Sequence, residues 1–275
     1  MSDAARRFRG DRVAVGASII LTIALGSALF APWITPHDPL AVNLSANYQP
    51  SSWAHPLGTD HLGRDTLSRL IAGARVSLGI AALSTIAGLV VGAAMGLIGA
   101  WRRGAADLAI RQVVDVLLAL PEMLMGIAII TIVGRGTTAT IVAVAVFAVP
   151  IFARIVRAAA LGVVSRDFVV AARAAGASDR RVIVHHILPH CLSPIAAQGT
   201  IMLGTAILIA SGLSFLGLGV QPPDPEWGAM LSRGRELLRT APLGAIAPGV
   251  AITATVLSFS LVGDGIRDAL DPRKK

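Results

Sequence analysis

The stretch VSLGIAALSTIAGLVVGAAMGLIGA, residues 76–100, runs for 25 residues without a charged side chain. A transmembrane helix needs about 20 apolar residues, because each residue advances it by about 1.5 Å and the hydrocarbon core is about 30 Å thick. The whole chain has a similar character. Of its 275 residues, 54% are hydrophobic and 15% are charged, whereas a soluble domain has about 25% charged residues. We therefore predict an all-α polytopic membrane protein and not a soluble enzyme.

Other apolar runs lie on both sides of this stretch. Together they predict about six transmembrane helices, at roughly 13–34, 76–100, 113–133, 138–160, 191–218 and 244–263. The first run is not followed by a small-residue cleavage pattern, so we interpret it as a membrane helix and not as a cleaved signal peptide.

The basic residues predict the orientation of these helices. If the N-terminus is cytoplasmic, 17 of the 24 Lys and Arg residues fall in inner segments and 7 fall in outer ones. Inner loops of membrane proteins carry such an excess of positive charge. We therefore expect both termini to be cytoplasmic. The net charge of +8 then reflects membrane topology, and we expect no nucleic-acid partner.

Two acidic residues fall within the third predicted span. Asp115 lies within about a turn of its inner end, and Glu122 lies deeper, directly after Pro121. An ionisable group inside a membrane is costly unless it faces protein or water. We expect Glu122 to face a partner helix or a wet cavity beside a proline kink, with a proton relay as the alternative.

Small residues recur along the second span. Gly88, Gly92 and Gly96 are four residues apart, which places them on one face of a helix. Such a face lets a second helix approach closely. We interpret these glycines as helix-packing residues and not as a nucleotide-binding loop.

The chain lacks the residues of several common catalytic sites. Its only lysines are Lys274 and Lys275, so no G-x-x-x-x-G-K-[ST] loop is present and the chain cannot be a conventional P-loop ATPase. Neither a G-x-S-x-G nor an H-E-x-x-H motif occurs. The single cysteine, Cys191, excludes an internal disulfide and a cysteine-based metal cluster. We predict no catalytic residue.

The six histidines do not form an obvious metal site. Three of them, His37, His55 and His61, are scattered over a predicted outer loop. At helical spacing His186 and His190 share a face, but no carboxylate or thiol partner stands at close spacing except Cys191, which points elsewhere. We expect no metal ion.

A charged, alanine-rich segment interrupts the apolar pattern: VVAARAAGASDRRVIVHHILPHCLSPI, residues 169–195. We predict a short helix over 168–175 capped by Ser165 or Asp167, a left-handed turn at Gly176, and a second short helix capped by Ser178. Pro189 would mark the end of the second helix or the bend into span five. The small alanines suit docking in a groove of a partner protein, and a segment resting on anionic lipid headgroups is the alternative.

This segment resembles the EAA loop of ABC-importer permeases, E-A-A-x-x-x-G followed, after nine intervening residues, by I-x-L-P. The residues that match or adjoin the motif, and that the resemblance implies as ATPase-coupling residues, are Ala171, Ala172, Gly176, Arg180, Arg181, Leu188 and Pro189. Val170 stands where the motif has glutamate, and His186 stands where it has isoleucine.

Two further stretches resemble the dipeptide/oligopeptide (and nickel) permeases. They are HPLGTDHLGRDTLSRLIAGARVSLGI, residues 55–80, and LSFLGLGVQPPDPEWGAML, residues 213–231. In that family an acidic residue often precedes LSFLGLG, where this chain has Ala210. The chain is identified as a C-type subunit with a type I ABC importer permease fold.

The resemblance implies a division of the chain into two parts. Residues 1–54 would hold the cytoplasmic tail, the first span and the start of the outer loop. Residues 55–275 would form the core permease, with a cytoplasmic coupling loop at 165–190. Pro222, Pro223 and Trp227 would belong to an outer gate region, with Trp227 at the membrane interface. We expect Asp60, Arg64 and Asp65 to pair with one another or with a partner permease.

The resemblance also implies the function. The chain would be a transport subunit of the cytoplasmic membrane, surrounded by lipid, that moves peptides by alternating access and binds no cofactor itself. ATP and Mg would be bound by two P-loop subunits, beside a second homologous permease and an extracytoplasmic substrate-binding protein. Nickel, glutathione or another small solute is the alternative cargo. An ion-coupled secondary transporter is the rival class.

Overall fold

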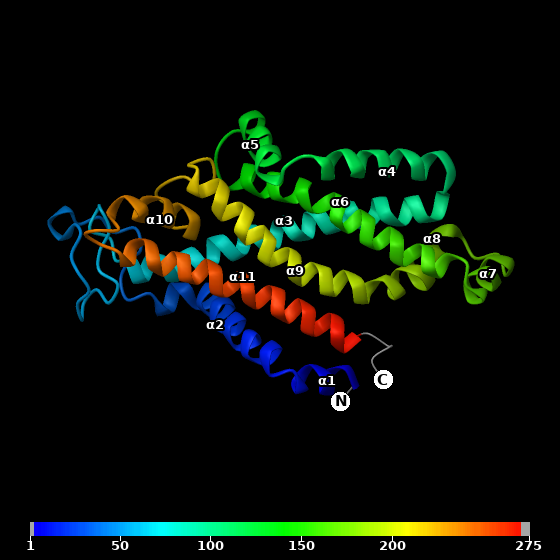
Figure 1. Ribbon diagram of the computed structural model, residues 1–275, viewed down its shortest axis with the longest axis horizontal. Coiled ribbons are helices and arrows are strands. Elements are labelled where there is room, and N and C mark those ends of the chain that lie inside the picture. Colours follow the sequence, from blue (N-terminus) through cyan, green and yellow to red (C-terminus); the bar gives the residue numbers. More distant parts are fainter. Residues whose placement is uncertain (1–2, 271–275) are drawn as a thin grey trace.

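The computed structural model describes residues 3–270 of the chain, and within that range it consists of helices and connecting loops (Figure 1). The basic residues Arg273, Lys274 and Lys275 of the predicted inner C-terminal segment lie outside the described residues. The α-helices are α1 (Asp3–Gly10), α2 (Arg12–Ile34), α3 (Thr66–Arg102), α4 (Gly104–Ala119), α5 (Glu122–Val133), α6 (Thr137–Val164), α7 (Asp167–Ala174), α8 (Asp179–Val182), α9 (Leu188–Phe215), α10 (Trp227–Gly234) and α11 (Leu243–Leu270).

Five of these helices are long and apolar enough to cross a membrane by themselves, and a bent pair makes up to six. They are α2, α3, α6, α11 and the continuous helix Asp179–Phe215, which contains α8 and α9. The prediction of an all-α polytopic membrane protein is therefore confirmed. The long helix α3 begins ten residues before the predicted span because the Asp65 carboxylate accepts a hydrogen bond from the Ser68 amide and so caps it at Thr66.

The third predicted span is not one straight helix. It consists of α4 and α5, whose axes are bent by 99° at Leu120 and Pro121. Proline lacks the amide hydrogen that would continue a helix, and it forces the residue before it out of the helical region. Leu120 is accordingly extended, with φ −82° and ψ 134°.

The two acidic residues of this span lie on different helices. Asp115 lies well inside α4, where it forms an ion pair with Arg154 of α6. Glu122 is exposed in the first turn of α5.

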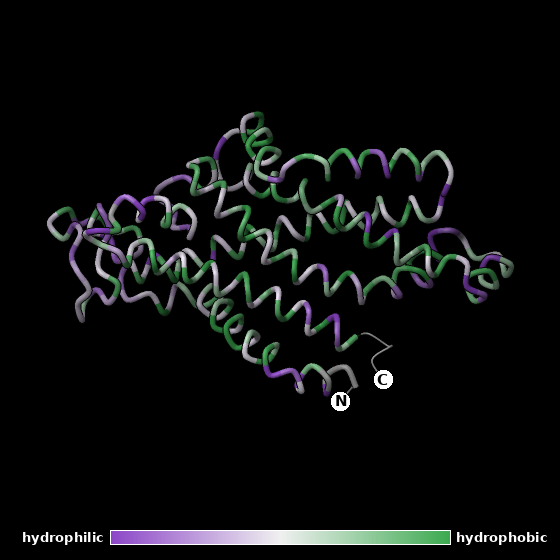
Figure 2. Tube along the Cα trace, in the orientation of Figure 1, coloured by the Kyte–Doolittle hydropathy of each residue, from purple (hydrophilic) through white to green (hydrophobic). Residues whose placement is uncertain are grey.

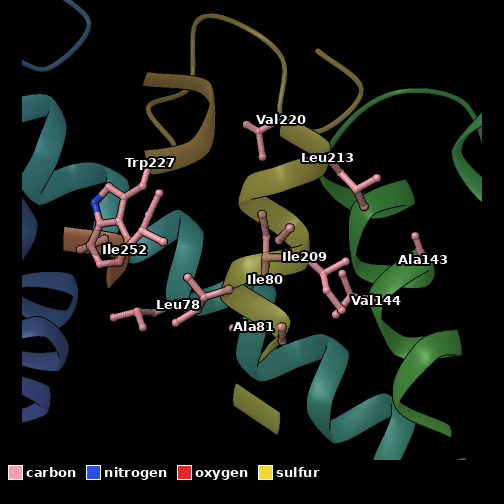
Figure 3. Packing of buried hydrophobic residues seen from close by; sticks show 14 of the residues in the cluster. Leu78, Ile80, Ala81, Ala143, Val144, Ile209, Leu213, Val220, Trp227 and Ile252 are labelled. Carbon is pink, nitrogen blue, oxygen red and sulfur yellow. The ribbon is translucent and has the colours of Figure 1, made fainter. Parts of the chain in front are cut away.

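The main apolar core lies where α3, α6, α9 and α11 meet (Figure 3). Ile80 of α3, Val144 of α6, Ile209 and Leu213 of α9 and Ile252 of α11 are all buried there. In Figure 2 hydrophobic residues continue along the long helices, and hydrophilic residues gather towards the two ends of the molecule. Many of the apolar side chains on these helices are exposed, among them Ile23, Val90 and Leu257. A belt of exposed apolar side chains between two polar ends is the surface expected of a protein that lies in lipid.

The three glycines of α3 lie against α6. A Cβ atom added to Gly88 would lie 2.4 Å from Ala148 Cβ, one added to Gly92 would lie 2.4 Å from the Val149 carbonyl oxygen, and one added to Gly96 would lie 2.6 Å from the Ala153 carbonyl oxygen. The two helices thus pack backbone to backbone along this face.

The two ends of the bundle carry different elements. Figure 1 shows the long loop before α3 together with α10 at one end, and α7 and α8 at the opposite end. Both described chain ends lie towards the α7 end. This arrangement agrees with the predicted side of the termini, because the positive-inside rule assigns the α7 end to the cytoplasm.

Candidate functional sites at the two ends of the bundle

The segment between α6 and α9 forms a helix–turn–helix at the inner end. The helix α7 ends at Ala174, and Gly176 has φ 81°, the left-handed conformation that glycine adopts without strain. A Cβ atom at Gly176 would meet nothing within 4 Å. The backbone conformation, and not lack of space, therefore requires glycine at this turn.

The second half of the segment continues directly into span five. The helix α8 passes into a π-helical turn, Ile183–Ile187, and then into α9. Pro189 stands at the beginning of α9, where the change in hydrogen-bond pattern accommodates its missing amide hydrogen. Of the two predicted roles of Pro189, the end of a separate short helix is wrong, and its place at the entry into span five agrees with the other.

The predicted helix caps are also only partly correct. Ser178 occupies the N-cap position of α8, but its side chain makes no capping hydrogen bond. At α7 the N-cap residue is Arg166, so neither Ser165 nor Asp167 caps that helix.

Four buried side chains attach this segment to the membrane helices. Val169, Val182, Ile187 and Cys191 are nearly inaccessible and pack with Ala100 of α3 and with the end of α6. Their burial leaves the opposite face of the segment free.

A polar contact to the end of α3 reinforces this attachment. The Trp101 indole Nε1 donates a hydrogen bond to Asp179 Oδ2 at 2.9 Å, and the Arg173 guanidinium carbon lies 4.9 Å from the centre of the Trp101 ring. Such a cation–π contact contributes about 0.5–1 kcal/mol at an exposed site. This contact of Trp101 was not predicted, and no spacing in the sequence indicates it.

The structure brings the predicted coupling residues together on this one segment. Ala171, Gly176, Arg180, Arg181 and Pro189 are exposed, whereas Ala172 and Leu188 are half-buried. The arginines make the exposed surface basic.

The two positions that depart from the EAA motif lie on the same segment. Val170 is exposed, and the half-buried His186 lies beside Phe168, with ring centres 6.5 Å apart. The His190 ring stacks on Phe168 at 5.2 Å, and its Nδ1 lies 2.9 Å from the His186 carbonyl oxygen. Both histidines therefore pack against Phe168.

The loop before α3 is built around two aspartates at the outer end. Asp60 accepts a hydrogen bond from Arg64 Nε at 2.8 Å and forms an ion pair with Arg64 Nη2 at 2.7 Å. Burial favours the neutral acid, but the hydrogen bonds from Arg64 and from the Leu62 amide outweigh it and hold the pKa of Asp60 below its usual range. The expected pairing of Asp60 with Arg64 is present.

The second aspartate, Asp65, pairs with histidine and not with arginine. The Nδ1 atom of His55 lies 2.9 Å from Asp65 Oδ1, and that of His37 lies 3.8 Å from Asp65 Oδ2. Burial opposes ionisation, but hydrogen bonds from Ser68 and His55 still lower the pKa of Asp65. His37 and His55 are therefore not scattered, because the loop folds back and brings their rings to 4.7 Å.

The predicted outer gate region is held against α3 and α9 by a buried carboxylate. Glu226 is fully buried and accepts hydrogen bonds from the Gly228 and Ala229 amides at 2.9 and 2.8 Å, which caps α10. The hydroxyl groups of Ser77 on α3 and Ser211 on α9 lie 3.3 and 3.4 Å from the same carboxylate. Glu226 was not among the predicted site residues, although its place just before α10 is a capping position.

Trp227 is not at a membrane interface. It is buried among core residues, and its indole nitrogen donates a hydrogen bond to the Leu70 carbonyl oxygen at 2.9 Å (Figure 3). The interface prediction was wrong because α10 packs against α11 and α9, which places the Trp227 side chain on α3. Pro222 and Pro223 remain exposed in the loop before α10.

Comparisons with known proteins agree with this architecture. Residues 88–275 match the family described as binding-protein-dependent transport system inner membrane component, and residues 1–50 match the N-terminal TM domain of oligopeptide transport permease C.

Relatives align over nearly the whole chain. The di/tripeptide transport system permease protein DppC of Pseudomonas aeruginosa is 41% identical over 98% of this chain and 90% of its own length. The dipeptide transport system permease protein DppC of Alkalihalophilus pseudofirmus is 40% identical over 99% of this chain and 90% of its own length. The glutathione transport system permease protein GsiD of Pectobacterium atrosepticum is 43% identical, with coverage of 98% and 90%.

A solved structure has the same fold. A chain of the MetNI methionine ABC transporter, in an inward-facing conformation, aligns with a TM-score of 0.60 and 21% identity over 74% of this chain and 96% of its own. The long helices, the inner helix–turn–helix and these matches together show that the chain belongs to the binding-protein-dependent transport family, as a multi-pass inner-membrane ABC importer permease of the C type.

Proposed function

We propose that this permease carries short peptides, such as dipeptides, across the cytoplasmic membrane as part of an ATP-driven importer. Two of the three relatives described above are named as peptide permeases, and each aligns over nearly its whole length. Glutathione is the second candidate cargo, because the third relative is named for it. Glutathione is itself a small peptide, so both candidates belong to one chemical class.

The inner helix–turn–helix is the proposed docking site for the ATP-binding subunits. The observation that carries this proposal is a segment with one face fixed by Val169, Val182 and Ile187 and with Arg180 and Arg181 exposed on its free surface. A rigid, basic projection fits an acidic or carbonyl-rich groove of a partner protein. The chain has no P-loop lysine, which supports assigning ATP and Mg to the partner.

The proposed assembly contains four kinds of subunit. This chain pairs with a second homologous permease, two P-loop ATP-binding subunits dock at the inner end, and an extracytoplasmic binding protein delivers cargo to the outer end. ATP binding to the docked subunits favours one of two permease states, because the partner binds the two states with different affinity. Alternating access follows from the exchange between these states.

The test is purification of the tagged chain from mild detergent, with ATPase activity and subunit identities measured in the eluate. We expect a second permease and P-loop ATPases to co-purify. The double variant Arg180→Glu, Arg181→Glu should lose the ATPases and keep the second permease. The matched control is Arg239→Glu at the outer end, which should keep both. An ATPase-free homo-oligomer from the unmodified chain would contradict the importer proposal and favour a secondary transporter.

The cargo is tested separately in cells that lack other peptide importers. Uptake of radiolabelled dialanine and of radiolabelled glutathione is compared with and without the chain and its partner subunits. Peptide uptake that depends on the chain is the expected result. Uptake of neither compound would contradict the proposed cargo.

A further inference from the structure

An exposed ion pair lies between two membrane helices, α4 and α6. The Arg154 guanidinium donates a hydrogen bond to Asp115 Oδ1 at 3.1 Å. The side chains are 62% and 68% exposed, respectively. Both residues line a cavity of about 110 Å³ that Arg111 and Arg157 also border. One water molecule needs about 10–15 Å³ of such space, so the cavity has room for several.

The pair lies about three turns from the inner ends of two helices that belong to candidate membrane spans. Asp115 is 11 residues from the inner end of α4, and Arg154 is 10 residues from the inner end of α6. At about 1.5 Å per residue these positions are about 16.5 Å and 15 Å along α4 and α6. Figure 1 shows α4 running beside α6 along the long axis of the bundle.

Lipid is an unsuitable neighbour for this pair. Charged side chains in the centre of a bilayer are costly and face protein or a water-filled cavity. The rest of α4 does not enclose the pair, because the buried residues of this helix are Asp107 and Val114. The exposed side of Asp115 and Arg154 must therefore face water, a polar ligand or a partner subunit in the assembled permease.

Further charges continue from this cavity towards the cytoplasm. Arg157 binds Asp107 through two hydrogen bonds, one of them 2.7 Å long, and Arg111 Nε lies 3.3 Å from the same carboxylate. Three guanidinium groups thus accompany two carboxylates along the groove between α4 and α6. The groove offers both signs of charge, with one positive charge in excess.

We propose that the groove at Asp115 and Arg154 is a transit site for zwitterionic cargo. Asp115 receives the ammonium group of the cargo, and Arg154 with Arg111 receives its carboxylate. The internal ion pair opens as cargo enters and re-forms as cargo leaves, so neither charge is left unpaired in the membrane. The inference rests on the proposed function, since peptides and glutathione both carry an ammonium and a carboxylate group.

The first experiment measures uptake of dialanine by the complete complex in proteoliposomes, with binding protein in excess. Asp115→Asn and Arg154→Gln should each lower uptake about tenfold or more, because a lost hydrogen bond to a charged group costs roughly a decade in rate. Co-purification of the partner subunits should not change. The charge-exchanged variant Asp115→Arg, Arg154→Asp should remain poor, because the pair is restored but each charge now meets the wrong end of the cargo.

Three outcomes would overturn the proposal. Restored uptake in the charge-exchanged variant would make the pair structural. Loss of the second permease from Asp115→Asn would make it a subunit contact. Unchanged uptake in both single variants would remove any function in transport. Failure of the proposed function itself is distinguishable, since the unmodified complex would then take up neither dialanine nor glutathione.

A second experiment tests access of water directly. In a Cys191→Ser background, which removes the only cysteine of the chain, Asp115→Cys is treated with a membrane-impermeant methanethiosulfonate. Val90→Cys is the matched control, because Val90 is similarly exposed but lies on an apolar span. We expect fast labelling at position 115, slowed by dialanine with its binding protein, and little labelling at position 90. Equal, slow labelling at both positions would refute a water-filled transit site.

Discussion

Alanine at position 92 tests the close packing of α3 against α6. The added Cβ atom would lie 2.4 Å from the Val149 carbonyl oxygen and 2.8 Å from Phe152 Cβ. The nearest of these atoms belongs to the backbone, so α3 and α6 have to move apart to admit the methyl group. Overpacking of this kind costs about 1–3 kcal/mol.

The same substitution also has a favourable effect that must be separated from this cost. Alanine is about 1 kcal/mol better than glycine in a helix interior. Gly79 lies on the same helix, and a Cβ atom there would meet nothing within 4 Å. Gly79→Ala therefore reports the intrinsic helix preference alone, and the difference between the two variants reports the clash.

We expect Gly92→Ala to be less stable than Gly79→Ala by about 1–3 kcal/mol. The measurement is unfolding of each purified variant by SDS in dodecyl maltoside micelles, followed by tryptophan fluorescence. Identical unfolding midpoints for the two variants would show that α3 and α6 do not pack backbone to backbone at position 92. The packing described for Gly88 and Gly96 would then also be in doubt.

Three other predictions concern the two ends of the molecule. Gly176→Val should lower transport and leave membrane insertion intact, because a β-branched residue is strained at φ 81°. Gly176→Asn should be tolerated, and uptake by the two variants at equal expression tests this difference. Because the pKa of Asp60 is lowered in the folded protein, ionised Asp60 stabilises the outer loop at a pH above its ordinary pKa of 3.8, and this stabilisation is lost as the pH falls through the lower folded pKa. Proteolysis of the loop should therefore increase as the pH falls through that range. Asp60→Asn should be less protected than the unmodified chain and should not show this pH dependence. Glu226→Gln should destabilise the protein by about 1–3 kcal/mol, because the NH2 group of the glutamine side chain would face the backbone N–H group of Gly228 or Ala229. A thermal midpoint equal to that of the unmodified chain would contradict this capping function.

The positions of most membrane helices could be predicted from the sequence, because uninterrupted apolar runs report span length directly. The second predicted span, 76–100, corresponds to helix α3, which ends at Arg102, close to the predicted limit at residue 100. The 99° bend between α4 and α5 could not be predicted in the same way. A hydropathy pattern is the same for a straight and a bent span, and Pro121 indicates only that the helix is disturbed.

Predictions about the sites succeeded where the signal was local. The left-handed turn at Gly176 follows from the preference of one residue type. The meeting of His37 with His55 depends on how a long loop folds back, and local patterns do not encode such a path. The burial of Trp227 likewise depends on tertiary packing, in this case of α10 against α11 and α9.

The continuity of Asp179–Phe215 makes this helix a lever between the two faces of the membrane. Its 37 residues correspond to a rod about 55 Å long. Arg180 and Arg181 stand at one tip, and Ser211, beside the buried Glu226, lies near the other. A tilt of about 5° at the inner tip displaces the outer tip by about 5 Å for a rod of this length. A small rotation imposed at the inner tip would in this way be carried to the outer mouth along a single piece of chain.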